Sequence, residues 1–170
     1  MPRLAMIGTV CLLALAGCGN SVDHDSAVKV ASSALTVTGN ANGQVVQIDT
    51  TKNGGQVDIM LTNHAGTGTA HVTGTIARNG NVTTTTVDVT LQNWHDPVEN
   101  VTLDGTLHEA GTFSALSPIA GDVTVNGALS STGAVHATVD FDVHGSYSAT
   151  GFAVNGDVGG NTINIQVGTP

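Results

Sequence analysis

The chain of 170 residues has few charged side chains, and basic residues are the scarcest. Four Lys and Arg stand against 13 Asp and Glu, which gives a formal net charge of −9 at pH 7. Nucleic-acid binding depends on clustered Lys and Arg that contact phosphates, so the composition predicts no nucleic-acid partner. Charged residues make up only 10% of the chain, whereas apolar residues make up 40%. Disordered chains show the opposite balance, and the sequence therefore predicts a folded protein.

Two of the residues that favour helices are also scarce. Glu and Lys are rare, while Thr, Val, Gly and Asn are abundant. Ala, Leu, Glu and Lys are the strong helix formers, whereas Thr and Val fit the pleated surface of a sheet. The composition therefore predicts an all-β fold class.

The first 18 residues carry the most specific pattern in the sequence. Met1 and Arg3 form a short polar start, and the uncharged stretch Leu4–Ala16 follows. This stretch is too short to span about 30 Å of hydrocarbon as a helix, and it is typical of the apolar region of a secretory signal. Its last residues read Leu-Ala-Gly-Cys, ending at Cys18. In this order, these features resemble a bacterial lipoprotein precursor with its lipobox Leu15-Ala16-Gly17-Cys18.

The resemblance implies how the chain is processed and divided. Cys18 would carry diacylglycerol and palmitate, and each buried acyl CH2 contributes about 0.8 kcal/mol to membrane binding. Residues 1–17 would be the lipoprotein signal peptide, and residues 18–25 a tether. Residues 26–170 would form a single β domain, with the membrane as its partner through the lipid anchor.

The resemblance also implies an address in the cell envelope. Gly19 follows the cysteine where Asp would retain a lipoprotein on the inner membrane, so a Gram-negative source would place the protein on the outer membrane. A Gram-positive source would leave it on the cytoplasmic membrane. Cys11 lies inside the signal, so the mature domain would have no thiol besides Cys18, no disulfide and no cysteine metal site.

A short N-terminal helix is one of two predictions for the start of the β domain. Asp25 and Ser26 are residues that cap helices, and apolar residues follow at helical spacing. These apolar residues are Ala27, Val28, Ala31, Ala34 and Leu35. A first strand over residues 29–38 is the alternative.

From Gln44 onward, apolar and polar residues alternate with a period of two, which predicts strands with one dry and one wet face. Turn-forming residues separate the alternating stretches, for example in Asn63–Gly68, Arg78–Asn81 and Gly159–Asn161. The short connections predict an antiparallel meander of about eight strands. Its apolar face must be hidden, so we expect the sheet to curl into a small barrel or a flattened two-layer roll.

Glycine recurs on the predicted dry face, in a pattern of apolar, polar, Gly, any residue, apolar. The pattern occurs at Val72–Ile76, Leu103–Leu107, Val125–Leu129, Val143–Tyr147 and Val154–Val158. Glycine weakens a strand, so its recurrence indicates strong bending or close approach of something packed against the sheet. The alternative is that the pattern recurs only because glycine is common in this chain.

Two groups of residues are candidate sites. The first is His136, Asp140, Asp142 and His144, which share the wet face of one predicted strand and could hold Zn²⁺ or Ca²⁺ with a further ligand. The more ordinary interpretation is a solvated strand face. The second is a ligand-contact loop with Trp94, His95, Asp96 and Glu99, for which the alternative is a strand connection whose Trp94 covers the edge of the core.

No pattern in the sequence indicates catalysis. There is no Gly-x-Ser-x-Gly elbow, no free cysteine nucleophile in the mature chain and no glycine loop that would cradle phosphate. We therefore expect no enzyme and no cofactor. The sequence predicts a lipid-anchored envelope protein with a non-catalytic binding or structural role and an envelope protein as its partner. The alternative is a carrier that holds a lipid or other apolar ligand inside the curled sheet.

Overall fold

The structure, a computed structural model, describes residues 21–48, 54–114, 120–148 and 151–168. The predicted signal peptide and Cys18 lie outside the described residues. One helix precedes eight strands. They are α1 (His24–Ile48), β1 (Gly54–Thr62), β2 (Thr69–Asn79), β3 (Val82–Asp96), β4 (Val101–Ser114), β5 (Ala120–Gly133), β6 (Ala137–Ser148), β7 (Gly151–Val158) and β8 (Asn161–Gly168).

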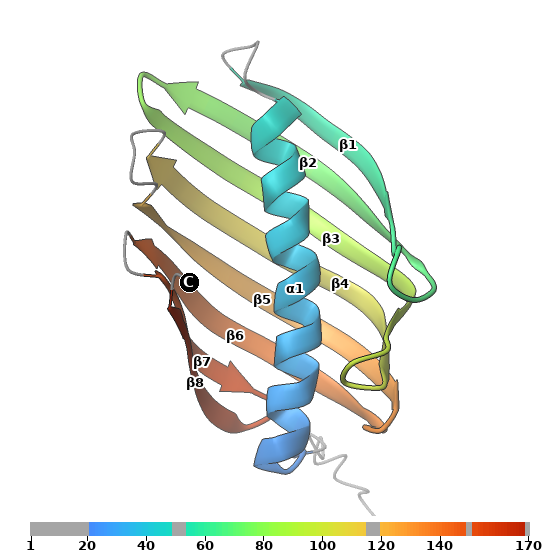
Figure 1. The fold of residues 1–170 in the computed structure, drawn as a ribbon. Coiled ribbons are helices and arrows are strands. Elements are labelled where there is room, and N and C mark those ends of the chain that lie inside the picture. Colours follow the sequence, from blue (N-terminus) through green and yellow to red (C-terminus); the bar gives the residue numbers. More distant parts are fainter. Residues whose placement is uncertain (1–20, 49–53, 115–119, 149–150, 169–170) are drawn as a thin grey trace, which may run out of the picture.

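The eight strands form one antiparallel sheet in sequence order, so the predicted meander is confirmed. Turns join the strands at the predicted positions, at residues 63–68, 80–81 and 159–160. β1 and β8 each have one neighbour and do not pair with each other, so the sheet is not closed. The twisted sheet curves around α1, which crosses its concave face (Figure 1). Of the two predicted shapes, the structure therefore has the flattened roll and not the closed barrel.

Alternation along each strand separates the two faces of the sheet. In β3, Val87, Val89 and Leu91 are buried, while the residues between them point to solvent or are half-buried. Opposite residues on neighbouring strands share a face, so the register carries this pattern across the sheet. The concave face is therefore apolar and the convex face polar.

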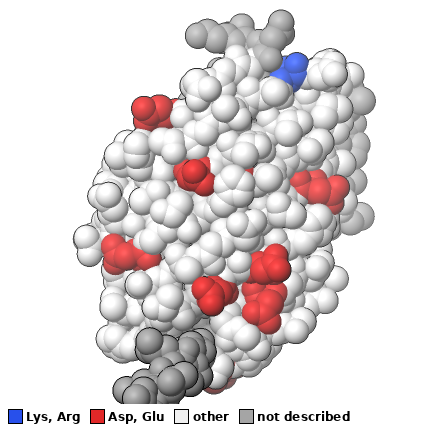
Figure 2. Space-filling model, turned by 180° about the vertical axis from the view of Figure 1, so that it is seen from behind, with Lys and Arg blue, Asp and Glu red and all other residues white. Residues whose placement is uncertain are grey.

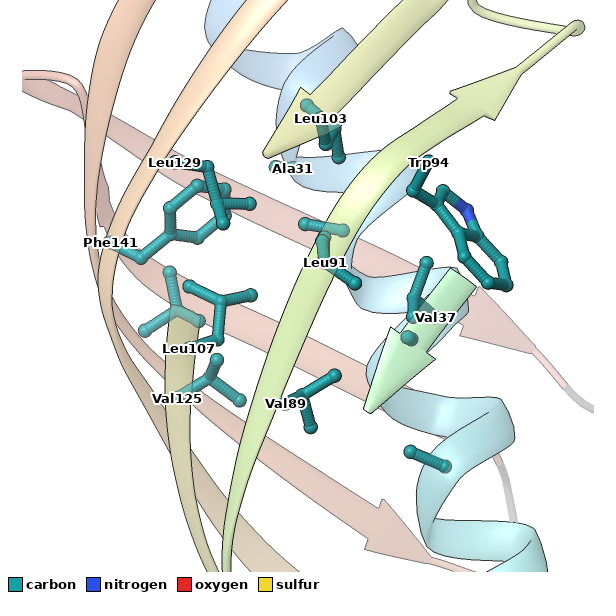
Figure 3. Close-up of a cluster of buried hydrophobic side chains, with 14 of the residues drawn as sticks. Ala31, Val37, Val89, Leu91, Trp94, Leu103, Leu107, Val125, Leu129 and Phe141 are labelled. Carbon is teal, nitrogen blue, oxygen red and sulfur yellow. The ribbon is translucent and has the colours of Figure 1, made fainter. Parts of the chain in front are cut away.

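α1 supplies the second layer of the roll. Its buried face also includes the polar residues Ser33, Thr38 and Asn42, but it consists mainly of small apolar side chains with no exposed surface, at Ala27, Val30, Ala31, Ala34, Val37, Ala41 and Val45. Because these side chains are short, the helix axis can approach the sheet closely. Figure 3 shows Ala31 and Val37 of the helix among Leu91, Leu103 and Trp94 of the sheet.

α1 is longer than the sequence predicts. It has 25 residues, so the alternative of a strand over residues 29–38 is wrong, and so is strand alternation from Gln44 to residue 48. The predicted cap at Asp25 and Ser26 is also wrong. The cap is Asp23, whose Oδ1 accepts a hydrogen bond from the Ser26 backbone N–H at 3.0 Å, and whose Oδ2 accepts one from the Ser26 hydroxyl at 2.8 Å. These bonds to the charged form lower the pKa of the Asp23 carboxyl.

Contacts with the last hairpin fix the residues before the helix. The Val22 carbonyl accepts a hydrogen bond from Asn161 Nδ2 at 2.7 Å. The Val22 side chain lies against Gly159 in the turn between β7 and β8. The fixed structure thus reaches back into the predicted tether, to within four residues of Cys18.

The recurring glycines have a common physical cause at four of their five positions. Gly74, Gly105, Gly127 and Gly156 have φ between 135° and 151°, a region that side chains rarely adopt. A Cβ at any of the four would lie closer than 3.0 Å to a carbonyl oxygen of the adjacent strand. At Gly145, with no such φ, the Phe152 ring and the Val123 side chain occupy that space. At these four positions the space is taken by the neighbouring strand of the same sheet, whereas the pattern predicts strong bending or close approach of something packed against the sheet.

Candidate functional site

The predicted metal residues lie on or beside β6 but are not brought together. Asp140, Asp142 and His144 are exposed on the convex face, and His136 is exposed just before the strand begins. Among the described residues, no group of three or more His, Cys, Asp or Glu side chains could hold a metal ion. The geometry therefore gives no support to a metal site on this strand.

Histidine on the convex face contacts aspartate instead. Three exposed pairs each join the two strands of one hairpin: His71–Asp58 at 2.7 Å, His108–Asp88 at 2.8 Å and His144–Asp122 at 3.5 Å. Figure 2 shows this face with acidic residues spread over it, some of them side by side. Exposed pairs of this kind contribute at most about 1 kcal/mol each, because water competes for both partners.

A groove of about 220 Å³ lies on the convex face, across β3, β4, β5 and β6. Its walls include the outward-facing threonines Thr84, Thr86, Thr112 and Thr124, and Ala110 lies between Thr86 and Thr124 in the register of the sheet. The His144–Asp122 pair lies at the β5–β6 side. The groove is open to solvent and offers hydroxyl groups and methyl groups rather than a set of converging catalytic groups.

Trp94 is a core residue. It is 8% exposed and packs near Val37 of α1 (Figure 3). A β-bulge between Leu91 and Trp94 turns the indole toward the concave face. At the bulge, Asn93 has a positive φ of 49°, and its N–H donates to Asp104 Oδ1 at 2.7 Å.

The other residues of the predicted ligand loop hold the connection between β3 and β4 in shape. Asp96 Oδ1 accepts hydrogen bonds from the backbone N–H groups of Val98, at 2.8 Å, and Glu99, at 3.3 Å. A ring nitrogen of His95 lies 3.1 Å from the Thr102 hydroxyl. These contacts favour a strand connection over a ligand-contact loop, because the side chains of His95 and Asp96 already have partners in β3, β4 and the residues between them.

Glu109 is a buried carboxyl that is not among the candidate residues predicted from the sequence. It lies on the concave face of β4 and has no exposed surface. A signal for it existed, because Glu109 falls at the same alternating position as the apolar Leu103 and Leu107. Asn42 of α1 donates a hydrogen bond from Nδ2 to Glu109 Oε1. Burial raises the pKa of the Glu109 carboxyl to about 7, against a lowering effect of the Asn42 hydrogen bond.

Few other groups around Glu109 compensate for the cost of burying its carboxyl. Val87 and Val125 lie opposite it on the two neighbouring strands. Glu109 Oε2 and Asn42 Oδ1 are buried and have no hydrogen-bond partner. Tyr147 has a raised pKa, mainly because of burial and in addition because of the Glu109 charge. The structure thus brings a carboxyl and an amide together at the interface of helix and sheet.

The concave face is where the predicted carrier would hold its ligand. α1 occupies this face, and its apolar side chains are buried against the sheet.

In the part of the chain that the structure describes, no helix is both long and apolar enough to cross a membrane. No protein family, curated protein or solved structure matches the chain.

Proposed function

We propose that the mature chain is a lipid-anchored protein of the bacterial cell envelope, with a binding or structural role and no catalytic one. The observation that carries the proposal is the resemblance of Leu15-Ala16-Gly17-Cys18 to a lipobox, and the contacts of Val22 support the position of the anchor. Val22 is bonded to Asn161 and packs on Gly159. Four residues of chain span at most about 14 Å, so an acylated Cys18 would hold this part of the domain close to the bilayer.

This geometry supports one orientation on the membrane. The turn between β7 and β8 would lie nearest the lipid, because it contacts Val22. The acidic convex face (Figure 2) would be repelled by anionic lipid, which favours a domain that is tethered but not adsorbed. This face would then be available to an envelope protein as the partner. In a Gram-negative source, Gly19 supports the outer membrane as the location.

The anchor is tested by replacing Cys18 with serine in the full precursor. We expect Cys18→Ser to abolish labelling with a radioactive or clickable fatty acid, and to move the protein from the membrane fraction to the soluble fraction. Cys11→Ser is the matched control, because Cys11 lies inside the predicted signal, and it should leave both labelling and membrane fractionation unchanged. Fatty-acid labelling that survives Cys18→Ser would refute the proposal.

The alternative function is a carrier of a lipid or other apolar ligand. It requires α1 to leave the concave face, since the helix occupies the space in which the ligand would lie. Native mass spectrometry of the purified protein separates the two functions. A lipid that stays bound to the purified protein would favour the carrier. A ligand-free protein would favour the binding or structural role.

A further inference from the structure

The contact between Asn42 and Glu109 joins α1 to the middle of the sheet. Both residues are buried, Asn42 at 8% exposure and Glu109 at 0%. The rest of the helix face in contact with the sheet consists largely of alanine and valine. The pair is a side chain–side chain hydrogen bond that links the helix to the sheet.

The protonation state of Glu109 decides how many bonds this pair can make. An ionised carboxylate only accepts hydrogen bonds, whereas a neutral carboxyl also has one O–H donor. With Glu109 ionised, Oε2 and Asn42 Oδ1 are two buried acceptors without a donor. With Glu109 neutral, Oε2–H can donate to Asn42 Oδ1 while Oε1 still accepts from Nδ2. The proton thus satisfies both orphaned atoms and closes a two-bond ring between acid and amide.

Among the described residues, no cation faces Glu109 to favour its ionised form. From β3 and β5 it meets Val87 and Val125, and from α1 it meets Asn42. The titratable group near it on β6 is Tyr147, whose own pKa is raised in part by Glu109. Lys29, the basic residue of α1, is exposed. An isolated buried carboxylate is costly, so the neutral form is favoured.

We propose that Glu109 and Asn42 form a proton-dependent latch that holds α1 on the concave face of the sheet. In the closed state, Glu109 is a neutral acid bonded twice to the Asn42 amide. When its O–H bond breaks, the proton passes to water and the carboxylate is left beside an amide oxygen. The closed state is then weakened relative to a state in which α1 has moved away and Glu109 is hydrated. Rising pH therefore loosens the helix.

The direction and size of the effect follow from linkage. The closed state binds the Glu109 proton more tightly than an open state with an ordinary carboxyl, so opening becomes easier as pH rises. A carboxyl whose pKa moves from 4.5 to about 7 changes the opening equilibrium by at most about 300-fold over this range. The change is nearly complete about one pH unit above the upper value, where the carboxyl is ionised in both states.

The first test reads the proton on Glu109 directly. The sequence contains two glutamates, Glu99 and Glu109, so labelling with carboxyl-¹³C glutamate gives two side-chain carboxyl resonances. Glu109→Gln removes one of them and assigns the other. We expect the Glu109 resonance of the folded protein to keep the chemical shift of a neutral acid at pH 6. A carboxylate shift for Glu109 at pH 5 would overturn the proposal.

The second test measures how well the amides of α1 are protected while the helix is packed on the sheet. Amide hydrogen exchange of the full chain, corrected for intrinsic rates, is compared at pH 5 and pH 8. We expect protection of α1 to fall by ten- to about 300-fold, while β4 and β5 stay protected. Glu109→Gln should remove this pH dependence, because a glutamine amide keeps the two-bond ring at every pH. Glu99→Gln, the matched control, should retain it.

Two outcomes of this comparison count against the latch. One is equal α1 protection at pH 5 and pH 8 in the unchanged chain, and the other is the same loss of protection in Glu109→Gln. If Glu109→Gln does not fold, Glu109→Leu takes its place, since an apolar side chain also abolishes the titration. A pH dependence that survives Glu109→Leu overturns the proposal equally.

Discussion

Replacing Gly105 with alanine would place a methyl group against the neighbouring strand. The backbone at Gly105 has φ of 135°, and a Cβ there would lie 2.6 Å from the Ala128 carbonyl oxygen and 3.2 Å from Leu129 Cδ2. Forcing a side chain into such a conformation costs about 1–3 kcal/mol. Shifting the backbone to relieve the overlap costs about 1–3 kcal/mol more. Alanine recovers about 0.4–1 kcal/mol by restricting the unfolded chain, so we expect a net loss of about 1–6 kcal/mol.

Equilibrium unfolding in urea measures this loss, with the fluorescence of Trp94 as the signal. The chain has one tryptophan, and it is buried in the folded state. Gly55→Ala is the matched control, because a Cβ at Gly55 meets nothing within 4 Å. It should change the free energy of unfolding by less than about 0.5 kcal/mol. If Gly105→Ala destabilises the protein no more than Gly55→Ala does, the steric explanation of the recurring glycines is wrong.

Three further changes test other parts of the structure. Leu107→Ala should lower the free energy of unfolding by about 2–5 kcal/mol in the same urea assay, because Leu107 has no exposed surface. Met60→Ala is the control and should have little effect, because the Met60 side chain is 60% exposed. For Glu109, the folded pKa of about 7 lies above the ordinary 4.5, so stability should be greatest below pH 4.5 and should fall by about 3 kcal/mol as pH rises to 7. A Glu109→Gln protein whose stability falls equally over this pH range would contradict that assignment. Asp23→Ala should lower the melting temperature, measured by circular dichroism, because the helix loses its cap. Asp23→Asn should have a melting temperature close to that of the unchanged chain, because asparagine can also cap the helix.

The strands could be predicted from sequence because their signal is local. Alternation and turn residues fix where a strand runs and which face is dry, and adjacent hairpins then follow in order. The length of α1 could not be predicted in this way. Thr36, Thr38, Gly39 and Asn40 are poor helix formers, and burial against the sheet outweighs their propensity.

The candidate sites were harder to predict than the fold, because they depend on register. The contact between His108 and Asp88 joins residues 20 positions apart, and only the pairing of β3 with β4 brings them together. The Asn42–Glu109 contact spans 67 positions and crosses from helix to sheet. Alternation alone places Glu109 on the dry face, but it does not reveal that an amide covers it.

The strand order of the sheet has a consequence for the route of folding. Each strand pairs with its neighbour in sequence, so the sheet can grow hairpin by hairpin with short loop closures. The helix has no such shortcut, because the bond from Asn161 to Val22 closes a loop of 139 residues. We therefore expect α1 to dock late in folding. Until then, the Val, Leu and Phe side chains of the concave face are exposed, so a chaperone or another apolar molecule can bind them before the helix does.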